Sequence, residues 1–342
     1  MKLSVIIPMY NVEKYIGKCL DSVINQDLLD SEYEIIVIND GSTDDSYALA
    51  ITYADSHNNI ILLNQENKGI SAARNKGIDE AKGKYLYFVD SDDYIRSNVL
   101  KTLLNYLNLH NLQVLAFNIV KVNGTNDNEG DKRPIESYQL SDVTNGITFM
   151  ANKGFRASVC WFILEREFLL KLKLRFIEGV MLEDVLFNAN LFTQVSRIAS
   201  LPVDIYYYLI HPNSIMRKRT PGHYLKMVKD YEFVVIELNS IIKEIETQEI
   251  PNKAKFIKGM KSLQGVFLNY LFVRMMRSNV NFNYINHVIK RLKNNELYPI
   301  QQFNKNKKDR LMLLIFNNKI IFYPFLIIYR FFSKRRMLNL YI

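Results

Sequence analysis

The segment YEIIVIND (33–40) is a continuous apolar run that ends in a carboxylate. Such a run is typical of a strand that is buried on both faces of a parallel sheet. LSVIIP (3–8), NIILLN (59–64) and KYLYFVD (84–90) are three further short strand candidates. The first hundred residues therefore predict four strands.

Helical patterns fill the gaps between these strands. Ser42-Thr43-Asp44-Asp45 predicts the cap of a helix that runs to about His57, and residues 71–81 predict another helix. Alternating strands and helices with short connections predict a parallel sheet with right-handed crossovers. A further helix follows the first strand, and its apolar face consists of Val12, Ile16, Leu20, Val23 and Ile24.

The chain is less regular after the fourth strand. VLAFNIVKV (114–122) is a strand candidate, and the polar segment GTNDNEGDKRP (124–134) predicts a mobile loop. Residues 222–294 predict two or three amphipathic helices, with breaks at Gly222 and Pro251.

The composition excludes several classes of protein. With 342 residues, 48% of them hydrophobic and 23% charged, the chain is neither fibrous nor disordered, and its length favours a main domain with an appended one. Cys19 and Cys160 have no metal-site spacing and fit a reducing compartment. The N-terminus lacks the features of an export signal, so we expect a cytoplasmic protein.

Charge is unevenly distributed along the chain. The formal net charge of +9 divides into −7 for residues 1–100, +3 for 101–220, +5 for 221–300 and +8 for 301–342. A uniformly basic protein would suggest a nucleic-acid partner, whereas an acidic front and a basic tail indicate two separate tasks. We therefore expect no nucleic-acid binding.

Carboxylates follow two of the predicted strands. Asp40 ends the second strand, and Asp90-Ser91-Asp92-Asp93 follows the fourth, where parallel-sheet proteins place their sites. Adjacent carboxylates repel one another unless a cation lies between them, and oxygen ligands of this kind suit Mg²⁺ or Mn²⁺. The alternative is that the acidic cluster only caps the following helix.

Four motifs occur in order: SVIIPMYN (4–11), VINDGSTDDS (37–46), NKGISAARNKGI (67–78) and FVDSDDY (88–94). Together they closely resemble the family 2 glycosyltransferases, which are inverting enzymes of the GT-A fold with nucleotide-sugar donors. The resemblance is strong over the first hundred residues and weak to about residue 220.

This resemblance implies an α/β protein of the GT-A fold, with a Rossmann-like, mostly parallel sheet flanked by helices and a C-terminal helical extension. Residues 1–112 would form the nucleotide-sugar-binding half and residues 113–220 the acceptor-binding half. Residues 221–342 would form a helical region with a basic, apolar tail.

The resemblance also implies roles for the donor-side residues. Asp40 would bind the nucleobase, which is usually uracil in this family, and Gly69 would allow close backbone approach. Arg74 would face the donor diphosphate or order the site, although a surface arginine paired with a neighbouring acid is the alternative. Pro8, Tyr10 and Asn11 would form the loop beside the base and ribose.

The cluster at 90–93 resembles the D-x-D element of the family. Asp90 would contact ribose, with Ser91 in the same donor-binding set, and Asp92 would hold Mn²⁺ or Mg²⁺ with help from Asp93. His211, in YYYLIHPNSIMRK (206–218), would complete the metal shell or is an ordinary surface histidine.

A catalytic base must come from the second half of the chain, since inversion requires a carboxylate that takes the acceptor proton. Glu183-Asp184 resembles the acidic pair at the start of the family's acceptor-side helix, with Asp184 as base and Glu183 as second candidate. A helix start lowers the basicity of a carboxylate, so the base would act by position. Simple helix-end charge is the alternative. Trp161 would stack on a sugar or, more commonly, belong to the core.

The function implied is a metal-dependent glycosyltransferase of the hexosyltransferase class, acting in bacterial polysaccharide synthesis. Its donor would be a UDP-sugar, and its acceptor a hydroxyl of a growing surface glycan that can be lipid-linked. An oxidoreductase is disfavoured because PMYNVEKY stands where G-x-G-x-x-G would be needed. The alternative is a non-catalytic nucleotide-sugar-binding or membrane scaffold protein.

The C-terminal tail predicts an interaction with a membrane surface. Two apolar runs, 311–316 and 320–329, are separated by Asn317-Asn318-Lys319, which disfavours a spanning helix. Apolar residues flanked by cations describe a segment in the interface of an anionic membrane, so we expect a peripheral location on the inner face of the cell membrane. A helix packed on the catalytic domain is the alternative. The flanking cations are Lys305, Lys307, Lys308, Arg310, Lys334, Arg335 and Arg336.

Overall fold

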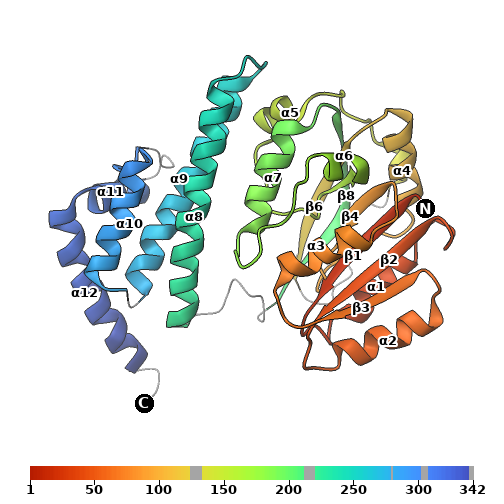
Figure 1. Cartoon of the computed structure of the whole chain (residues 1–342), viewed down its shortest axis with the longest axis horizontal. Coiled ribbons are helices and arrows are strands. Elements are labelled where there is room, and N and C mark those ends of the chain that lie inside the picture. The colour runs from red at the N-terminus through yellow and green to blue at the C-terminus, as the bar shows by residue number, and fades with distance from the viewer. Residues whose placement is uncertain (124–132, 212–219, 279, 302–306, 339–342) are drawn as a thin grey trace. The chain divides into compact units, whose positions relative to one another are not determined.

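The first compact unit of the chain is built on an eight-stranded sheet with strand order β3-β2-β1-β4-β7-β6-β8-β5 (Figure 1). The computed structural model describes residues 1–123, 133–211, 220–278, 280–301 and 307–338. This unit comprises Met1–Phe149 and Arg156–Ser214, and the second comprises Met150–Phe155 and Ile215–Ile342. The strands are β1 (Leu3–Met9), β2 (Tyr33–Asp40), β3 (Ile60–Gln65), β4 (Tyr85–Phe88), β5 (Tyr94–Ile95), β6 (Val114–Asn123), β7 (Phe162–Glu165) and β8 (Ile198–Ile210).

The four predicted strands are confirmed as the parallel part of the sheet. β1 pairs with β2 and with β4, and β2 pairs with β3, all in parallel. Every residue of β1 and of β2 is buried, as their continuous apolar sequences require. The remaining strands are mixed, because β6 and β8 are parallel whereas β7 and β5 join their neighbours in antiparallel fashion.

Helices surround this sheet in Figure 1. The helix α3 (Ile70–Glu80) packs directly on β1 and β2 at Gly77. A Cβ added to this glycine would lie 2.4 Å from Cγ2 of Ile6 on β1. The helix predicted after the cap Ser42–Asp45 is confirmed: it runs from Ser46 to Ser56, and Asp45 is its N-cap residue. The helices are α1 (Ile16–Ile24), α2 (Ser46–Ser56), α3 (Ile70–Glu80), α4 (Leu100–Leu109), α5 (Gly146–Lys153), α6 (Arg166–Lys171) and α7 (Glu183–Gln194), and η1 (Ile135–Ser137) is a short 3₁₀ turn.

The second unit is helical. The prediction of two or three helices over 222–294 is confirmed by three of them, with Pro251 in the first break. The predicted break at Gly222 is wrong, since the side chain of Thr220 caps the helix that contains it by accepting from the backbone N–H of His223. The predicted loop 124–134 lies, for residues 124–132, outside the described part of the chain. The helices are α8 (Pro221–Glu246), α9 (Lys253–Arg277), α10 (Phe282–Asn294), α11 (Lys307–Asn317) and α12 (Lys319–Leu338).

Aromatic packing forms part of the core of this helical unit. Phe272 of α9 stacks on Phe316 of α11 with ring centroids 4.9 Å apart, and Phe322 of α12 packs edge-on against both. Within the described residues, no single helix meets the length and hydropathy expected of a membrane span. The pair Arg310–Asn317 and Lys319–Phe332 meets them jointly, with a bend of 105° between the two helices.

Candidate active site

The loops that follow β1 and β2 are tied together by Asn11. Its side-chain Oδ1 accepts from the backbone N–H of Thr43 at 2.8 Å, and its own backbone N–H donates to Oγ of Ser42 at 3.2 Å. Pro8 is buried within β1 opposite Ile38, whereas Tyr10 is 43% exposed. The structure therefore brings the loop after β1, which is predicted to lie beside the nucleobase and ribose of the donor, next to the loop after Asp40.

Asp40 organises the entry to α3. Its Oδ1 accepts from the backbone N–H of Lys68 and from Nε2 of Gln65, and its Oδ2 accepts from the backbone N–H of Gly69, each at 2.8 Å. Gly69 has φ +91°, which other residues rarely adopt, so a side chain there would strain this turn. Asp40 is only 3% exposed, and the geometry shows it holding this loop. Its predicted nucleobase contact stays a prediction.

The acidic loop at 90–93 divides into two parts. Asp93 is 2% exposed, and its two oxygens accept from the hydroxyl of Tyr206 at 2.6 Å and the backbone N–H of Leu209 at 2.8 Å. The same hydroxyl accepts from the backbone N–H of Asp90 at 3.1 Å. Ser91 is buried as well. Tyr206 thus ties the acidic loop to β8, and the geometry favours a structural role for Asp93 over metal ligation.

Asp92 and His211 form the other part of this region. Oδ2 of Asp92 lies 2.8 Å from Nε2 of the His211 imidazole. The other ring nitrogen of His211, Nδ1, is buried and has no hydrogen-bond partner among the described residues. His211 is 8% exposed, and its ring packs at a tilt of 37° against the ring of Tyr15, so it is not an ordinary surface histidine. Burial and the neighbouring Asp90 raise the pKa of Asp92.

A divalent cation needs more ligands than this pair supplies. No group of three or more His, Cys, Asp or Glu residues is poised to hold a metal within the part of the chain that the structure describes. Asp92 and His211 nevertheless combine a carboxylate and an imidazole, a donor set that suits Mn²⁺ when diphosphate oxygens and water fill the remaining positions. The two residues therefore fit a metal bound together with a nucleotide.

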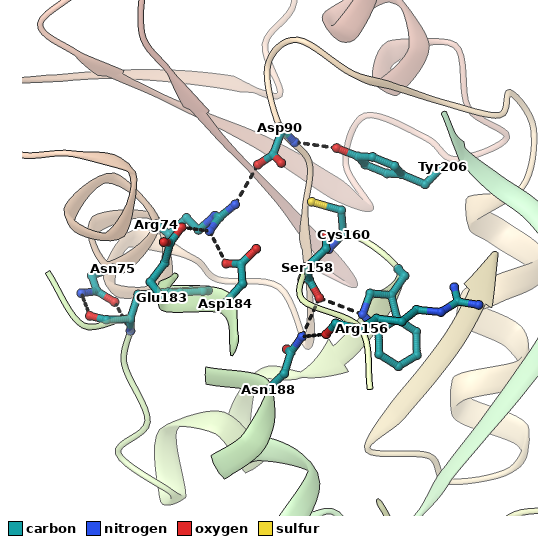
Figure 2. A network of polar contacts seen from close by, with 12 residues as sticks. Arg74, Asn75, Asp90, Arg156, Ser158, Cys160, Glu183, Asp184, Asn188 and Tyr206 are labelled. Atoms are coloured by element: carbon teal, nitrogen blue, oxygen red, sulfur yellow. Dashed lines mark hydrogen bonds and ion pairs between the residues drawn. The ribbon is translucent and has the colours of Figure 1, made fainter. Parts of the chain in front are cut away.

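Arg74 is the centre of a buried charge network (Figure 2). The guanidinium is 1% exposed and donates from Nη2 to Asp90 at 2.8 Å. Its Nη1 donates to Glu183 at 3.0 Å and to Asp184 at 2.5 Å. The alternative of a surface arginine is wrong. Arg74 joins the acidic loop after β4 to the start of α7, which is the ordering role that the resemblance implied.

Two asparagines hold α7 and the segment before it in place. Asn75, next to Arg74 on α3, exchanges two hydrogen bonds of 2.9 Å with the backbone of Phe176. Asn188 donates to the backbone carbonyls of Arg156 and Ser158 at 2.9 and 2.6 Å. Figure 2 shows both asparagines beside the Arg74 network. Sequence reasoning missed these two asparagines and Tyr206. Asn75 stands within NKGISAARN, Tyr206 opens YYYLIH, and Asn188 follows Glu183 on the same helix, so the signals were present but none marked these side chains.

The carboxylates in this network have elevated pKa values. Burial, opposed by Arg74 and reinforced by Glu183 and Asp90, raises the pKa of Asp184 to about 7. Burial also raises the pKa of Glu183. The expectation that the helix start lowers the basicity of Asp184 is wrong, because burial raises the pKa of this carboxyl by more than Arg74 lowers it.

Asp184 has the features of a general base. Its side chain is 17% exposed, and the carboxylate oxygen that does not accept from Arg74 has no hydrogen-bond partner among the described residues. A pKa near neutrality leaves about half of the carboxyl groups ionised near pH 7 and gives the ionised form a strong affinity for a proton, which suits a general base. Trp161 is 3% exposed and packs on Phe149, Phe162 and Phe192, which confirms the core reading of this tryptophan.

The fold and the site define a GT-A protein: a parallel half-sheet, an acidic loop beyond its fourth strand, and an acidic helix start joined to that loop. The family model for glycosyl transferase family 2 matches residues 4–169. The uncharacterized glycosyltransferase YibD of Escherichia coli K12 is 30% identical over 240 residues, which cover 67% of this chain and 69% of YibD. This chain belongs to glycosyl transferase family 2.

Two further relatives cover less of their own length. The uncharacterized glycosyltransferase EpsJ of Bacillus subtilis 168 is 33% identical over 222 residues, which are 62% of either chain. The poly(ribitol-phosphate) beta-glucosyltransferase of Bacillus spizizenii W23 is 30% identical over 82% of this chain, but only 42% of that enzyme is matched. The chain therefore spans under two thirds of both relatives.

Solved structures confirm the GT-A fold. The crystal structure of Staphylococcus aureus TarS 1–349 in complex with UDP-GlcNAc has a TM-score of 0.63 and 24% identity, covering 86% of this chain and 80% of that one. The mannosyltransferase PcManGT from Pyrobaculum calidifontis, in complex with GDP-Man and Mn²⁺, has a TM-score of 0.54 and 15% identity, covering 92% and 86%.

Proposed function

We propose that this chain transfers a sugar from a UDP-sugar to a hydroxyl of a growing surface glycan, with inversion at the anomeric carbon. The observation that carries this proposal is the contact of Arg74 with both Asp90 and Asp184. It places a base candidate with a pKa of about 7 beside the acidic loop after β4. A carboxyl group with a raised pKa beside an acidic loop is typical of a catalytic acid or base.

Asp184 takes the acceptor proton in this mechanism. The acceptor oxygen attacks the anomeric carbon while the bond from that carbon to the diphosphate breaks, and the proton passes to the unpaired carboxylate oxygen of Asp184. Arg74 holds the other oxygen at 2.5 Å and so fixes the direction of the carboxylate. Glu183, 6% exposed and also held by Arg74, orients the guanidinium.

Asp92 and His211 would hold a divalent cation, with Mn²⁺ or Mg²⁺ as the candidates. Such an ion supplies positive charge that stabilises the departing nucleoside diphosphate. The hydrogen bond between Asp93 and Tyr206 holds the acidic loop against β8 and so fixes the position of the neighbouring Asp92 beside His211. The complex of PcManGT with Mn²⁺ supports this assignment by fold analogy.

The donor and acceptor classes rest on the relatives. TarS binds UDP-GlcNAc, which supports a UDP-sugar donor for this chain. The Bacillus spizizenii relative acts on poly(ribitol-phosphate), and TarS is a poly(ribitol-phosphate) beta-N-acetylglucosaminyltransferase. We therefore favour a hydroxylated cell-surface polymer, or its lipid-linked precursor, as acceptor.

Donor hydrolysis and binding test this function. The purified chain is mixed with UDP-GlcNAc, UDP-glucose, UDP-galactose and GDP-mannose, each with Mn²⁺, with Mg²⁺ or with a chelator, and free UDP or GDP is measured. We expect release of UDP from at least one UDP-sugar only when the metal is present. Tight binding of a UDP-sugar without any release, with or without added glycan acceptors, would favour the non-catalytic alternative.

A further inference from the structure

One face of α12 is apolar and exposed between Ile320 and Phe332. Ile320, Pro324, Ile327 and Phe331 recur at the spacing that places residues on one side of a helix. Ile320 is 85% exposed, and Ile327 and Phe331 are 56% and 54% exposed. Ile321, Ile328 and Phe332 widen the row, and this set of seven residues is called the α12 apolar face below.

The opposite side of α12 is anchored within the helical unit. Phe322 and Leu326 are fully buried, and Tyr323 donates from its hydroxyl to Oδ1 of Asn286 on α10 at 2.7 Å. Arg330 donates to the backbone carbonyls of Met275 and Val280 at 2.8 and 2.9 Å, at and just beyond the C-terminal end of α9. The apolar face is therefore the outer side of a firmly packed helix.

Positive charge flanks this face in the sequence. Arg310, which is exposed, and Lys319 precede it, and Lys334, Arg335 and Arg336 follow in the last turns of α12. The segment 301–342 has a net charge of +8 and only one acidic residue, Asp309. No charged residue interrupts the face itself between Ile320 and Phe332 apart from the inward-pointing Arg330.

We infer that the α12 apolar face docks in the plane of an anionic lipid bilayer. A helix that presents apolar side chains between clusters of lysine and arginine inserts that face at the boundary of headgroups and acyl chains, while its cations contact the anionic headgroups. A second copy of this chain is the disfavoured occupant, because two segments of the same high positive charge repel one another. This docking does not depend on the proposed transfer reaction.

Liposome flotation tests the inference with the full chain. Vesicles contain phosphatidylglycerol and phosphatidylcholine in equal parts, or phosphatidylcholine alone. We expect the chain to float with the anionic vesicles at about 0.05 M salt, at least about tenfold more than with neutral ones, and to lose most binding at about 0.5 M salt. Failure to float with anionic vesicles at low salt would overturn the inference.

A pair of matched double variants isolates the face. Ile328→Glu with Phe331→Glu places two charges on residues that are 56% and 54% exposed, and should lower the partition coefficient about a hundredfold or more. Leu29→Glu with Leu109→Glu makes the same change of charge at positions that are 69% and 79% exposed in the first unit. This control should bind nearly as the unaltered chain does. Equal losses in both variants would overturn the inference, since net charge alone would then explain binding.

Sedimentation without lipid addresses the competing occupant. We expect the same sedimentation coefficient for the unaltered chain and the Ile328→Glu, Phe331→Glu variant. A dimer that this variant dissociates would assign the α12 apolar face to a second copy of the chain and overturn membrane docking.

Discussion

Arg74 and Asp184 are 110 residues apart in the chain, yet Nη1 of the arginine lies 2.5 Å from Oδ1 of the carboxylate. The same guanidinium reaches Asp90, 16 residues away, and Glu183, 109 residues away. One buried cation thus contacts three carboxyl groups and joins the donor-side loop to the helix that carries the base candidate. The arrangement explains how two halves of the fold present their acidic groups to one another.

Loss of the base should abolish turnover without loss of donor binding. Asp184→Asn preserves size but removes the proton acceptor, so kcat should fall by roughly two to four orders of magnitude. The Kd for the UDP-sugar, measured by calorimetry, should change by less than about twofold. Glu183→Gln is the matched control, and an active Asp184→Asn beside an inactive Glu183→Gln would exchange the two roles.

The pH profile should report the same carboxylate. Because the pKa of Asp184 is about 7 and a general base must be ionised, kcat/KM should fall about tenfold for each pH unit below that value. Above pH 8 the ionisation of Asp184 no longer limits the rate. Residual activity of Asp184→Asn should lack this acidic limb. A profile that stays flat between pH 5 and 8 would contradict the assignment of Asp184.

Removal of the buried cation should destabilise the first unit. Arg74→Met leaves Asp90, Glu183 and Asp184 together without compensation, which should cost about 3–5 kcal/mol in unfolding free energy. Arg175→Met is the control, because Arg175 pairs with Asp79 where the two side chains are 36% and 61% exposed. That change should cost no more than about 1 kcal/mol. Similar losses in urea titrations of both variants would argue against a central role for Arg74.

Metal-dependent nucleotide binding should require Asp92. Asp92→Ala should remove the Mn²⁺-dependent part of UDP binding in calorimetry, and His211→Ala should weaken it by about tenfold or more. Asp45→Ala, which alters an exposed carboxylate in the turn before α2, is the control. Mn²⁺-dependent UDP affinity that survives in Asp92→Ala would refute the metal assignment.

Loss of the Tyr206 hydroxyl should weaken UDP binding more than loss of another buried tyrosine hydroxyl. Tyr206→Phe removes the group that bonds both Asp93 and the backbone of Asp90, which should cost about 1–3 kcal/mol and raise the Kd for UDP in the presence of Mn²⁺. Tyr85→Phe removes one bond of 3.1 Å to Asn108 and should leave that Kd unchanged. If both variants bind UDP as the unaltered chain does, the acidic loop does not depend on Tyr206.

Local sequence was sufficient for the parallel half of the sheet. A run such as YEIIVIND is buried on both faces as a central strand, and apolar patterning was enough to find all four parallel strands, including the edge strand β3. The same patterning placed Asp40 and the acidic loop at strand ends, and the four motifs indicated the family. The antiparallel strands β5 and β7 escaped prediction, because strands of two and four residues are too short to show a periodicity.

Tertiary structure alone decided how the acidic residues are used. Asp92 and Asp93 are neighbours in the sequence, but β8 gives them different environments. Asp93 accepts hydrogen bonds from Tyr206 and Leu209 of β8, whereas Asp92 contacts His211. Local reasoning from the helix start likewise predicted a weakly basic Asp184, whereas its pKa is raised to about 7. The physical reason is that desolvation and charge pairing depend on which distant segments enclose a group, and this information is absent from the residues beside it in the chain.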